Sequence, residues 1–380
     1  MTSANTTQTA PEDLSVYGDR LARLQSEMDR TGIDVTVVGP SSDFRYLTGF
    51  DAHLSERMTL LIVPRSGPVS VVVPMLEAPL ILSRRELFDI SAWTETEAPW
   101  DRAASLMELR DGGRGTTIAV SDQLWSIFLL RLQASIPKAS WVSATPAMRP
   151  LRMHKDDRER ELLREVSRRT DEAWEEFIAS DRIAGLTEQQ AMTLLRDRTA
   201  ARGLTIHGGI CASGPNSASP HHHTSDRVIQ PGDSVIFDWG GTLEGYHSDV
   251  TRTVHIGPPS DEYRTVYDTV RAANQAAYEA VQPGIPCQDV DRAARDVITA
   301  AGYGDAFIHR VGHGLGLDIH EEPYMVGGNE LRLAAGMVFS DEPGIYLDGR
   351  FGIRIEDTVI CVDDGGDRIN DATRDLIEMG

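Results

Sequence analysis

The feature that most constrains the fold is a set of five ionisable side chains in the second half of the chain. They are Asp238, Asp249, His313, Glu342 and Glu356. Asp238 and Glu342 end strongly apolar runs, where an unpaired charge is costly, and this favours metal ligands over solvated surface acids. Four carboxylates and one imidazole form an oxygen-rich set, which suits Mn²⁺, Co²⁺, Zn²⁺ or Fe²⁺ better than copper or an iron–sulfur cluster.

The first two carboxylates lie in a predicted hairpin. Residues 235–239 form a short apolar run typical of a buried strand, and residues 249–256 resume β-branched alternation after a glycine-rich turn. Side chains alternate along a strand, so both strands can direct Asp238 and Asp249 to the same side. Two neighbouring carboxylates repel each other. Each raises the pKa of the other unless a cation lies between them.

The second half repeats this arrangement. Residues 337–342 predict a strand that ends at Pro343-Gly344, and residues 351–361 predict one further strand with Arg354 and Glu356 on one face. His313 supplies the only nitrogen ligand. With bridging carboxylates, five ligands suffice for two metals about 3.5–4 Å apart.

The amino-terminal part alternates between predicted strands and helices, which indicates an α/β domain. We expect strands at residues 33–38, 58–63, 69–73 and 116–120, and helices at residues 14–31, 79–87, 102–108 and 124–135. Gly112-Gly113-Arg114-Gly115 lacks the continuation of a nucleotide-binding fingerprint. We place this domain at residues 13–148 and expect Pro150 to interrupt a linker near residues 146–156.

The remainder, residues 149–380, predicts an α+β domain in which a curved antiparallel sheet is backed by helices. Two amphipathic helices precede each hairpin. We expect them at residues 157–180, 187–202, 263–281 and 287–301, with Thr187 as an N-cap.

The composition limits the possible binding partners and indicates the cellular compartment. The 37 basic and 58 acidic side chains give a net charge of −21, which argues against nucleic acid or an anionic membrane as a partner. The three cysteines, Cys211, Cys287 and Cys361, are scattered, as expected of free thiols in a reducing compartment. Residues 1–12 lack the apolar core of a secretory signal, and no run approaches the roughly 18 apolar residues of a membrane span. We therefore expect a cytoplasmic protein.

The five motifs, in this order and context, resemble the metal-dependent pita-bread peptidase family, which includes methionine aminopeptidase, Xaa-Pro aminopeptidase and Xaa-Pro dipeptidase (prolidase). The amino-terminal part, including Tyr46-Leu47-Thr48-Gly49-Phe50, is similar to the creatinase/prolidase type. The resemblance implies a homodimer and two divalent metal ions, manganese first, with cobalt, zinc or iron as alternatives. It also implies that Asp238 binds one metal, that Asp249 and Glu356 bridge both, and that His313 and Glu342 complete the other.

Four further residues are expected to act in the site. By resemblance, His221 contacts substrate near the scissile bond and His320 hydrogen-bonds the scissile amide or carbonyl. His309 can line the same pocket or be a structural histidine. Arg354 can orient the acidic site through charge-assisted hydrogen bonds or form a structural salt bridge. We interpret His222 and His223, which directly follow His221, as a polar loop cluster.

The resemblance implies a short peptide substrate in which proline follows the scissile bond. Glu342 is expected to take a proton from the attacking water and deliver it to the leaving nitrogen, while His320 or His221 and one metal stabilise the oxyanion. We expect an Xaa-Pro dipeptidase first and an Xaa-Pro aminopeptidase second. Some family dipeptidases carry a carboxylate-binding arginine where this chain has Tyr324, and the nearest later arginine is Arg332. Two functions of a different class stay open, a non-peptide amide hydrolase or lyase and a metal-free binding protein.

Overall fold

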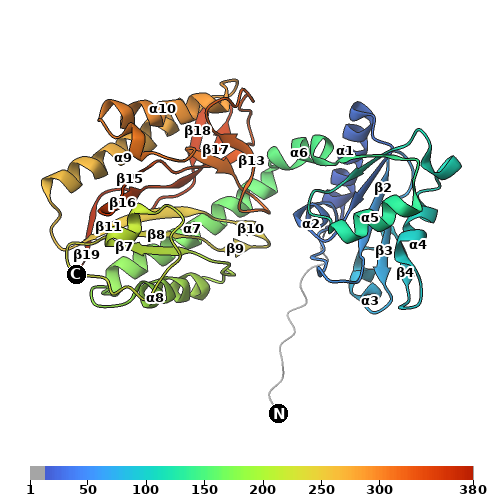
Figure 1. Ribbon diagram of the computed structural model, residues 1–380, viewed down its shortest axis with the longest axis horizontal. Helices are drawn as coiled ribbons and strands as arrows, with labels where there is room; N and C mark the ends of the chain where they lie inside the picture. Colours follow the sequence, from blue (N-terminus) through green and yellow to red (C-terminus); the bar gives the residue numbers. More distant parts are fainter. Residues whose placement is uncertain (1–12, 380) are drawn as a thin grey trace, which may run out of the picture. The chain divides into compact units, whose positions relative to one another are not determined.

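A computed structural model describes residues 13–379, which form two compact units (Figure 1). The first unit ends at Arg152 and the second begins at Met153. Within the described residues, no helix is both long and apolar enough to cross a bilayer. The polar residues 1–12, which we expected to lack a secretory signal, lie outside the described part. All three cysteines are buried free thiols.

The first unit contains a six-stranded mixed sheet in the order β4-β3-β2-β1-β5-β6. The strands are β1 (Val35–Val38), β2 (Leu60–Pro64), β3 (Ser70–Pro74), β4 (Asp89–Trp93), β5 (Thr117–Val120) and β6 (Ser140–Ser143). The helices are α1 (Ser15–Thr31), α2 (Ser42–Thr48), α3 (Ala78–Ile81), α4 (Pro99–Leu106), α5 (Ser126–Ser135) and α6 (Thr145–Met153). The α/β prediction is confirmed.

The short helix α2 was not predicted, and three other elements of this unit also differ from the sequence analysis. The edge strands β4 and β6 were not predicted, because both are partly polar, β4 is only partly buried and β6 is largely exposed. They form by parallel pairing with β3 and β5. The expected linker is helix α6, which contains Pro150. An interior proline removes one helical hydrogen bond, but Ala147, Met148 and Leu151 are buried, and their packing offsets that loss.

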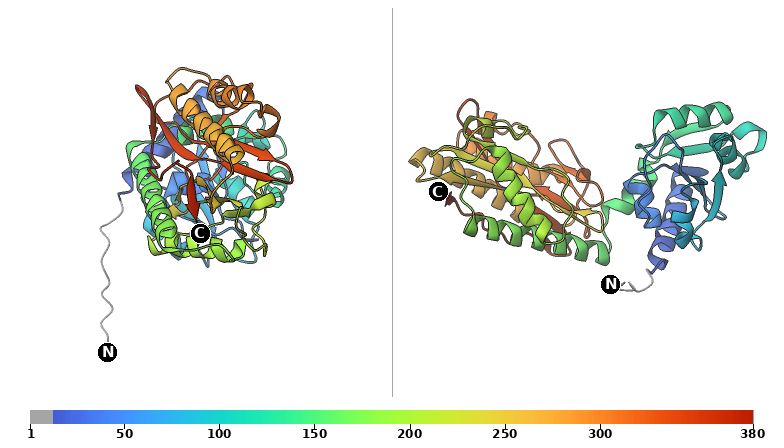
Figure 2. Two further views of the ribbon diagram at one scale, coloured as in Figure 1. Left: turned by 90° about the vertical axis from the view of Figure 1, so that its left-hand side faces the viewer. Right: turned by 90° about the horizontal axis from the view of Figure 1, so that it is seen from below.

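Within residues 153–379, four helices flank the strands of the second unit. They are α7 (Asp157–Ser180), α8 (Glu188–Ala201), α9 (Asp261–Ala280) and α10 (Cys287–Ala300). Thr187 accepts a hydrogen bond from the Gln190 amide in a capping box, as its N-cap assignment predicts. Figure 1 shows α7 and α8 beside one half of the strands and α9 and α10 beside the other, and Figure 2 shows the same grouping from two further sides.

The strands of this unit form two larger sheets and two short hairpins. One sheet has the order β19-β11-β8-β7 and the other the order β13-β12-β14-β17-β18. The first is built from β7 (Ile210–Ser213), β8 (Ser234–Trp239), β11 (Val250–Ile256) and β19 (Ile377–Met379). The second is built from β12 (Gly312–Gly314), β13 (Glu321–Met325), β14 (Val338–Asp341), β17 (Asp357–Val362) and β18 (Gly365–Arg368). The hairpins pair β9 (Thr242–Leu243) with β10 (Tyr246–His247), and β15 (Gly344–Leu347) with β16 (Phe351–Arg354).

The two sheets join at Thr251 and Glu356, which form an antiparallel bridge in which the Glu356 amide donates to the Thr251 carbonyl at 3.1 Å. This junction explains why the single strand expected at residues 351–361 was wrong. The chain changes partner there, so that β16 pairs with β15 and β17 pairs with β14. The expected α+β domain of a curved sheet backed by helices is confirmed, with β19 running parallel to β11 as the exception to the antiparallel pattern.

Candidate metal centre

The first two carboxylates lie on one side of the β8–β11 ladder. Thr251 is the ladder partner of Asp238, and Asp249 precedes Thr251 by two residues, so strand alternation places both carboxylates on the same side. Asp249 is buried, whereas Asp238 is partly exposed. Burial, and then the neighbouring charge of Asp238, raise the pKa of Asp249 well above its ordinary value.

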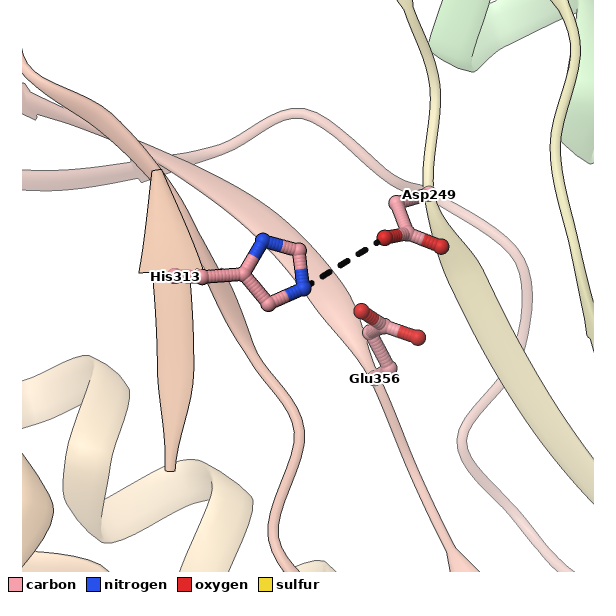
Figure 3. A group of neighbouring side chains, drawn as sticks. All are labelled: Asp249, His313 and Glu356. Atoms are coloured by element: carbon pink, nitrogen blue, oxygen red, sulfur yellow. Dashed lines mark ion pairs between the residues drawn. The ribbon is translucent and has the colours of Figure 1, made fainter. Parts of the chain in front are cut away.

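The other three residues come from the second sheet and its junction with the first. His313 is the central residue of β12, Glu342 directly follows β14, and Glu356 stands between β16 and β17. The Nε2 atom of His313 lies 3.3 Å from Glu342 Oε1 and 3.6 Å from Asp249 Oδ2. Figure 3 shows the side chains of Asp249, His313 and Glu356 pointing toward one another, and one ligand atom from each lies within 4.8 Å of the others.

The electrostatics of this cluster suit a divalent cation. Burial and then the charge of Asp249 raise the pKa of Glu356 well above its ordinary value. Burial also opposes ionisation of Glu342, but the hydrogen bond from His313 and the charges of His313, His309 and Arg354 together outweigh it and hold the pKa of Glu342 at about 2. Buried carboxylates that resist ionisation are stabilised as anions when a cation lies between them. The donor set therefore fits a hard or borderline divalent metal.

Arg354 links the carboxylate of Asp238 to the hydroxyl groups of Thr251 and Tyr346 by hydrogen bonds. Its guanidinium donates to Asp238 Oδ2 at 2.6 Å, to Thr251 Oγ1 at 3.1 Å and to the Tyr346 hydroxyl at 2.9 Å. The Thr251 hydroxyl in turn donates to Glu356 Oε2 at 2.6 Å. The sequence analysis missed Thr251 and Tyr346. Thr251 could have been found, because it shares a strand face with Asp249, whereas nothing local indicated Tyr346.

Three predicted histidines surround the same centre. The ring of His320 packs edge-on against His313 with 4.1 Å between centroids, and His309 Nε2 lies 2.9 Å from the Tyr346 hydroxyl. Burial lowers the pKa of both, that of His320 to about 4 with the charges of His313 and Arg310 contributing. The charge of His221 acts on both of these histidines, so the structure brings His221 to the same site.

Comparison with known proteins identifies the family. The family model described as "Metallopeptidase family M24" matches residues 161–363, and "Creatinase/Prolidase N-terminal domain" matches residues 20–154. The chain belongs to metallopeptidase family M24. It is therefore an enzyme of a metal-dependent peptidase family, and the predicted resemblance is confirmed.

Individual relatives of this M24 metallopeptidase match over nearly its whole length. "Probable dipeptidase PepE" of Mycobacterium bovis is 38% identical over 96% of this chain and 97% of its own. "Xaa-Pro dipeptidase" of Lactobacillus helveticus is 33% identical over 94% of this chain and 98% of its own. The crystal structure of dipeptidase PepE from Mycobacterium ulcerans matches with a TM-score of 0.91 at 38% identity, covering 97% of this chain and all of that chain.

The two histidines after His221 stand apart from the metal centre of this M24 metallopeptidase. His222 Nε2 lies 2.9 Å from the buried carboxylate of Glu188, at the start of α8, and His223 is exposed. Glu188 also accepts hydrogen bonds from Ser213 and Ser225, so it holds the loop that carries His221. The polar loop cluster expected here thus includes one structural hydrogen bond, between His222 and Glu188.

A hollow of about 250 Å³ opens beside Asp238 and Asp249. The sequence analysis missed two histidines that line it, His207 and His247, whose ring centroids are 5.7 Å apart. Ile319, next to His320, borders the same hollow.

Proposed function

We propose that this M24 metallopeptidase is an Xaa-Pro dipeptidase, which hydrolyses the peptide bond preceding proline in a short peptide. The observation that carries the proposal is the convergence of buried Asp249, His313 and Glu356 beside three further histidines. A 33% identical relative that bears the name Xaa-Pro dipeptidase supports the substrate class.

Two divalent metal ions complete the proposed site, with manganese first and cobalt, zinc or iron as alternatives. Asp238, Asp249, His313, Glu342 and Glu356 would hold these ions. The chemistry that bound divalent ions supply is a lowered pKa for water and polarisation of the substrate carbonyl.

The protein side chains position the substrate and move the proton. Glu342 is ionised at neutral pH, so it can accept a proton from the attacking water and deliver it to the leaving nitrogen. With a pKa of about 4, His320 is a neutral imidazole at neutral pH, and it donates a hydrogen bond to the scissile group together with His221. His309 lines the same pocket, and Arg354 orients Asp238.

A second candidate function is an Xaa-Pro aminopeptidase that acts on longer peptides. Tyr324 favours it, because this residue stands where some family dipeptidases carry an arginine for the proline carboxylate. Arg332, the nearest later arginine, is exposed and donates to the Gly284 carbonyl at 2.6 Å, which leaves it poorly suited to that task.

Metal analysis of protein purified without chelator, followed by turnover of Xaa-Pro and Xaa-Pro-Xaa peptides, tests the proposal. We expect two bound divalent ions per chain and faster cleavage of the dipeptides. Faster cleavage of the longer peptides would instead support the aminopeptidase. Metal-loaded protein that cleaves neither would reject both. The proposal includes a homodimer in the cytoplasm, for which sedimentation analysis and cell fractionation are the corresponding measurements.

A further inference from the structure

A buried lysine lies against the loop that carries His320. Lys155 directly precedes Asp156, the N-cap of α7, and its amide donates to the Gly336 carbonyl at 2.9 Å. Its ammonium group donates to Glu321 Oε1 at 2.5 Å. The side chain of Lys155 is 1% exposed and that of Glu321 is 10% exposed, so this ion pair is shielded from solvent. The start of α7 is therefore joined to the start of β13 by a buried pair of opposite charges.

The loop that carries His320 has no regular structure of its own. Residues 315–320 connect β12 to β13 and belong to neither a helix nor a strand. His320 is the last residue of this loop, and Glu321 is the first residue of β13. The ring of His320 packs edge-on against that of His313 in β12. Because Glu321 directly follows His320, a shift of the Glu321 backbone would move His320 relative to the candidate metal ligands.

The absence of a side chain at Gly316 shows how closely the ion pair packs against this loop. A Cβ atom at Gly316 would lie 2.7 Å from Glu321 Oε1 and 3.0 Å from Lys155 Cε, and the first distance is shorter than van der Waals contact allows. The Gly316 carbonyl also accepts a hydrogen bond from the His247 amide at 2.8 Å. The loop is thus held near its beginning by a backbone hydrogen bond and at its end by the ion pair.

We propose that Lys155 is a positioning residue of the reaction. By holding the Glu321 carboxylate it fixes the backbone of His320, and with it the imidazole that contacts the scissile group. This inference rests on the proposed function, which gives His320 that contact.

The energetics of buried charges support a positioning role for Lys155. A buried ion pair adds little net stability over apolar residues of similar volume, because desolvation offsets the Coulomb attraction, but it can select one conformation. Misplacing a catalytic group by about 1 Å can lower the rate by roughly a hundredfold. A contact that fixes His320 therefore acts mainly on kcat.

The experiment measures kcat and KM for the dipeptide Met-Pro with metal-loaded enzyme. Lys155→Met keeps the length of the side chain and removes its charge, and we expect kcat to fall roughly ten- to hundredfold with a smaller change in KM. The same substitution in a His320→Ala enzyme should change kcat by less than about twofold, because the group that Lys155 positions is already absent. A purely stabilising role would instead lower kcat by the same factor in both backgrounds.

Two further variants keep the test decisive if Lys155→Met fails to fold. Lys155→Met/Glu321→Gln removes both charges together, so that no buried charge is left unpaired, and should lower kcat to a similar extent. Gly316→Ala retains both charges but displaces them with its methyl group, and should also lower kcat. Gly327→Ala is the matched control, because a Cβ atom there meets nothing within 4 Å, and it should keep the wild-type kcat.

Two results would overturn the inference. One is a wild-type kcat in any folded variant that removes or displaces the ion pair. The other is an equal fall in kcat when Lys155→Met is made in the wild-type and in the His320→Ala enzyme. A metal-loaded wild-type enzyme that cleaves no Xaa-Pro peptide would reject the proposed function instead, so the two failures are distinguishable. Urea unfolding of each variant shows whether a lower rate reflects a smaller folded fraction.

Discussion

Removing the metal should destabilise the protein, and the loss should grow as the pH rises. Ligand occupancy at about one hundred times the dissociation constant is worth about 2.7 kcal/mol, which corresponds to roughly 5–10 °C in Tm for a unit of this size. Without metal, Asp249 and Glu356 have raised pKa values in the folded state. Their stabilising contribution is complete below the unfolded pKa and is lost as the pH rises toward the folded pKa.

The pKa shifts of His313 and Glu342 do not reverse this loss of stability of the metal-free protein with rising pH. His313 has a raised pKa, so its contribution also declines as the pH rises through that value. The pKa of Glu342 is lowered to about 2, so its contribution changes only in more acidic solution, below the unfolded value of 4.5. The metal-dependent gain in Tm should therefore be larger near about pH 7.5 than near about pH 5, since the metal replaces protons on these carboxylates.

Differential scanning calorimetry of metal-loaded and chelator-treated protein at both pH values measures this difference. Taking the difference at each pH removes contributions from distant groups such as Asp171, whose pKa burial raises to about 6. Asp249→Asn is the matched variant, because it removes one buried charge at nearly constant volume. Its metal-free form should be more stable than metal-free wild type near neutral pH, and added metal should stabilise it less. A metal-dependent gain in Tm that is equal at both pH values would refute the reasoning.

Three further predictions concern single side chains. Glu342→Gln should lower kcat by roughly 10²–10⁴-fold, because the amide cannot accept the proton, and steady-state kinetics on Xaa-Pro dipeptides at saturating metal checks this; near-normal turnover would reject its role. Thr251→Val should weaken metal binding by roughly 10–100-fold, because Glu356 and Arg354 lose a shared hydroxyl, and metal titration measures the change; an unchanged affinity would show that the hydroxyl does not position Glu356. Glu188→Gln should cost about 1–3 kcal/mol of unfolding free energy in urea, because an amide NH₂ would face the donors of Ser213, Ser225 and His222; equal stability would refute the account of this loop.

The sequence predicted that Asp238 and Asp249 lie on the same side of the sheet because strand alternation is a local property. Asp238 and Asp249 were placed on one side of a hairpin from the spacing of β-branched and apolar residues alone, and the observed register agrees. The edge strands β4 and β6 escaped prediction because pairing, and not their own pattern, makes them strands. Tyr346 was not predicted, because the neighbouring sequence does not indicate that its hydroxyl contacts both Arg354 and His309.

The alternation of side chains along β11 also explains how the ligands are held in position. The residue that holds them could not be predicted from the sequence. On β11, Thr251 faces the site and Arg252 faces the other side, where its fully buried guanidinium donates to the Glu356 carbonyl at 2.6 Å and to Asp357 at 2.7 Å. Burial opposes ionisation of Asp357, but the charges of Arg252, Arg368 and Arg374 together outweigh it and lower the pKa of Asp357. Arg252 thus connects β11, which directly follows Asp249, to the segment that contains Glu356 and Asp357. In the sequence these partners are over 100 positions apart, so only the folded structure shows that an ion pair behind the sheet sets the spacing of the acids in front of it.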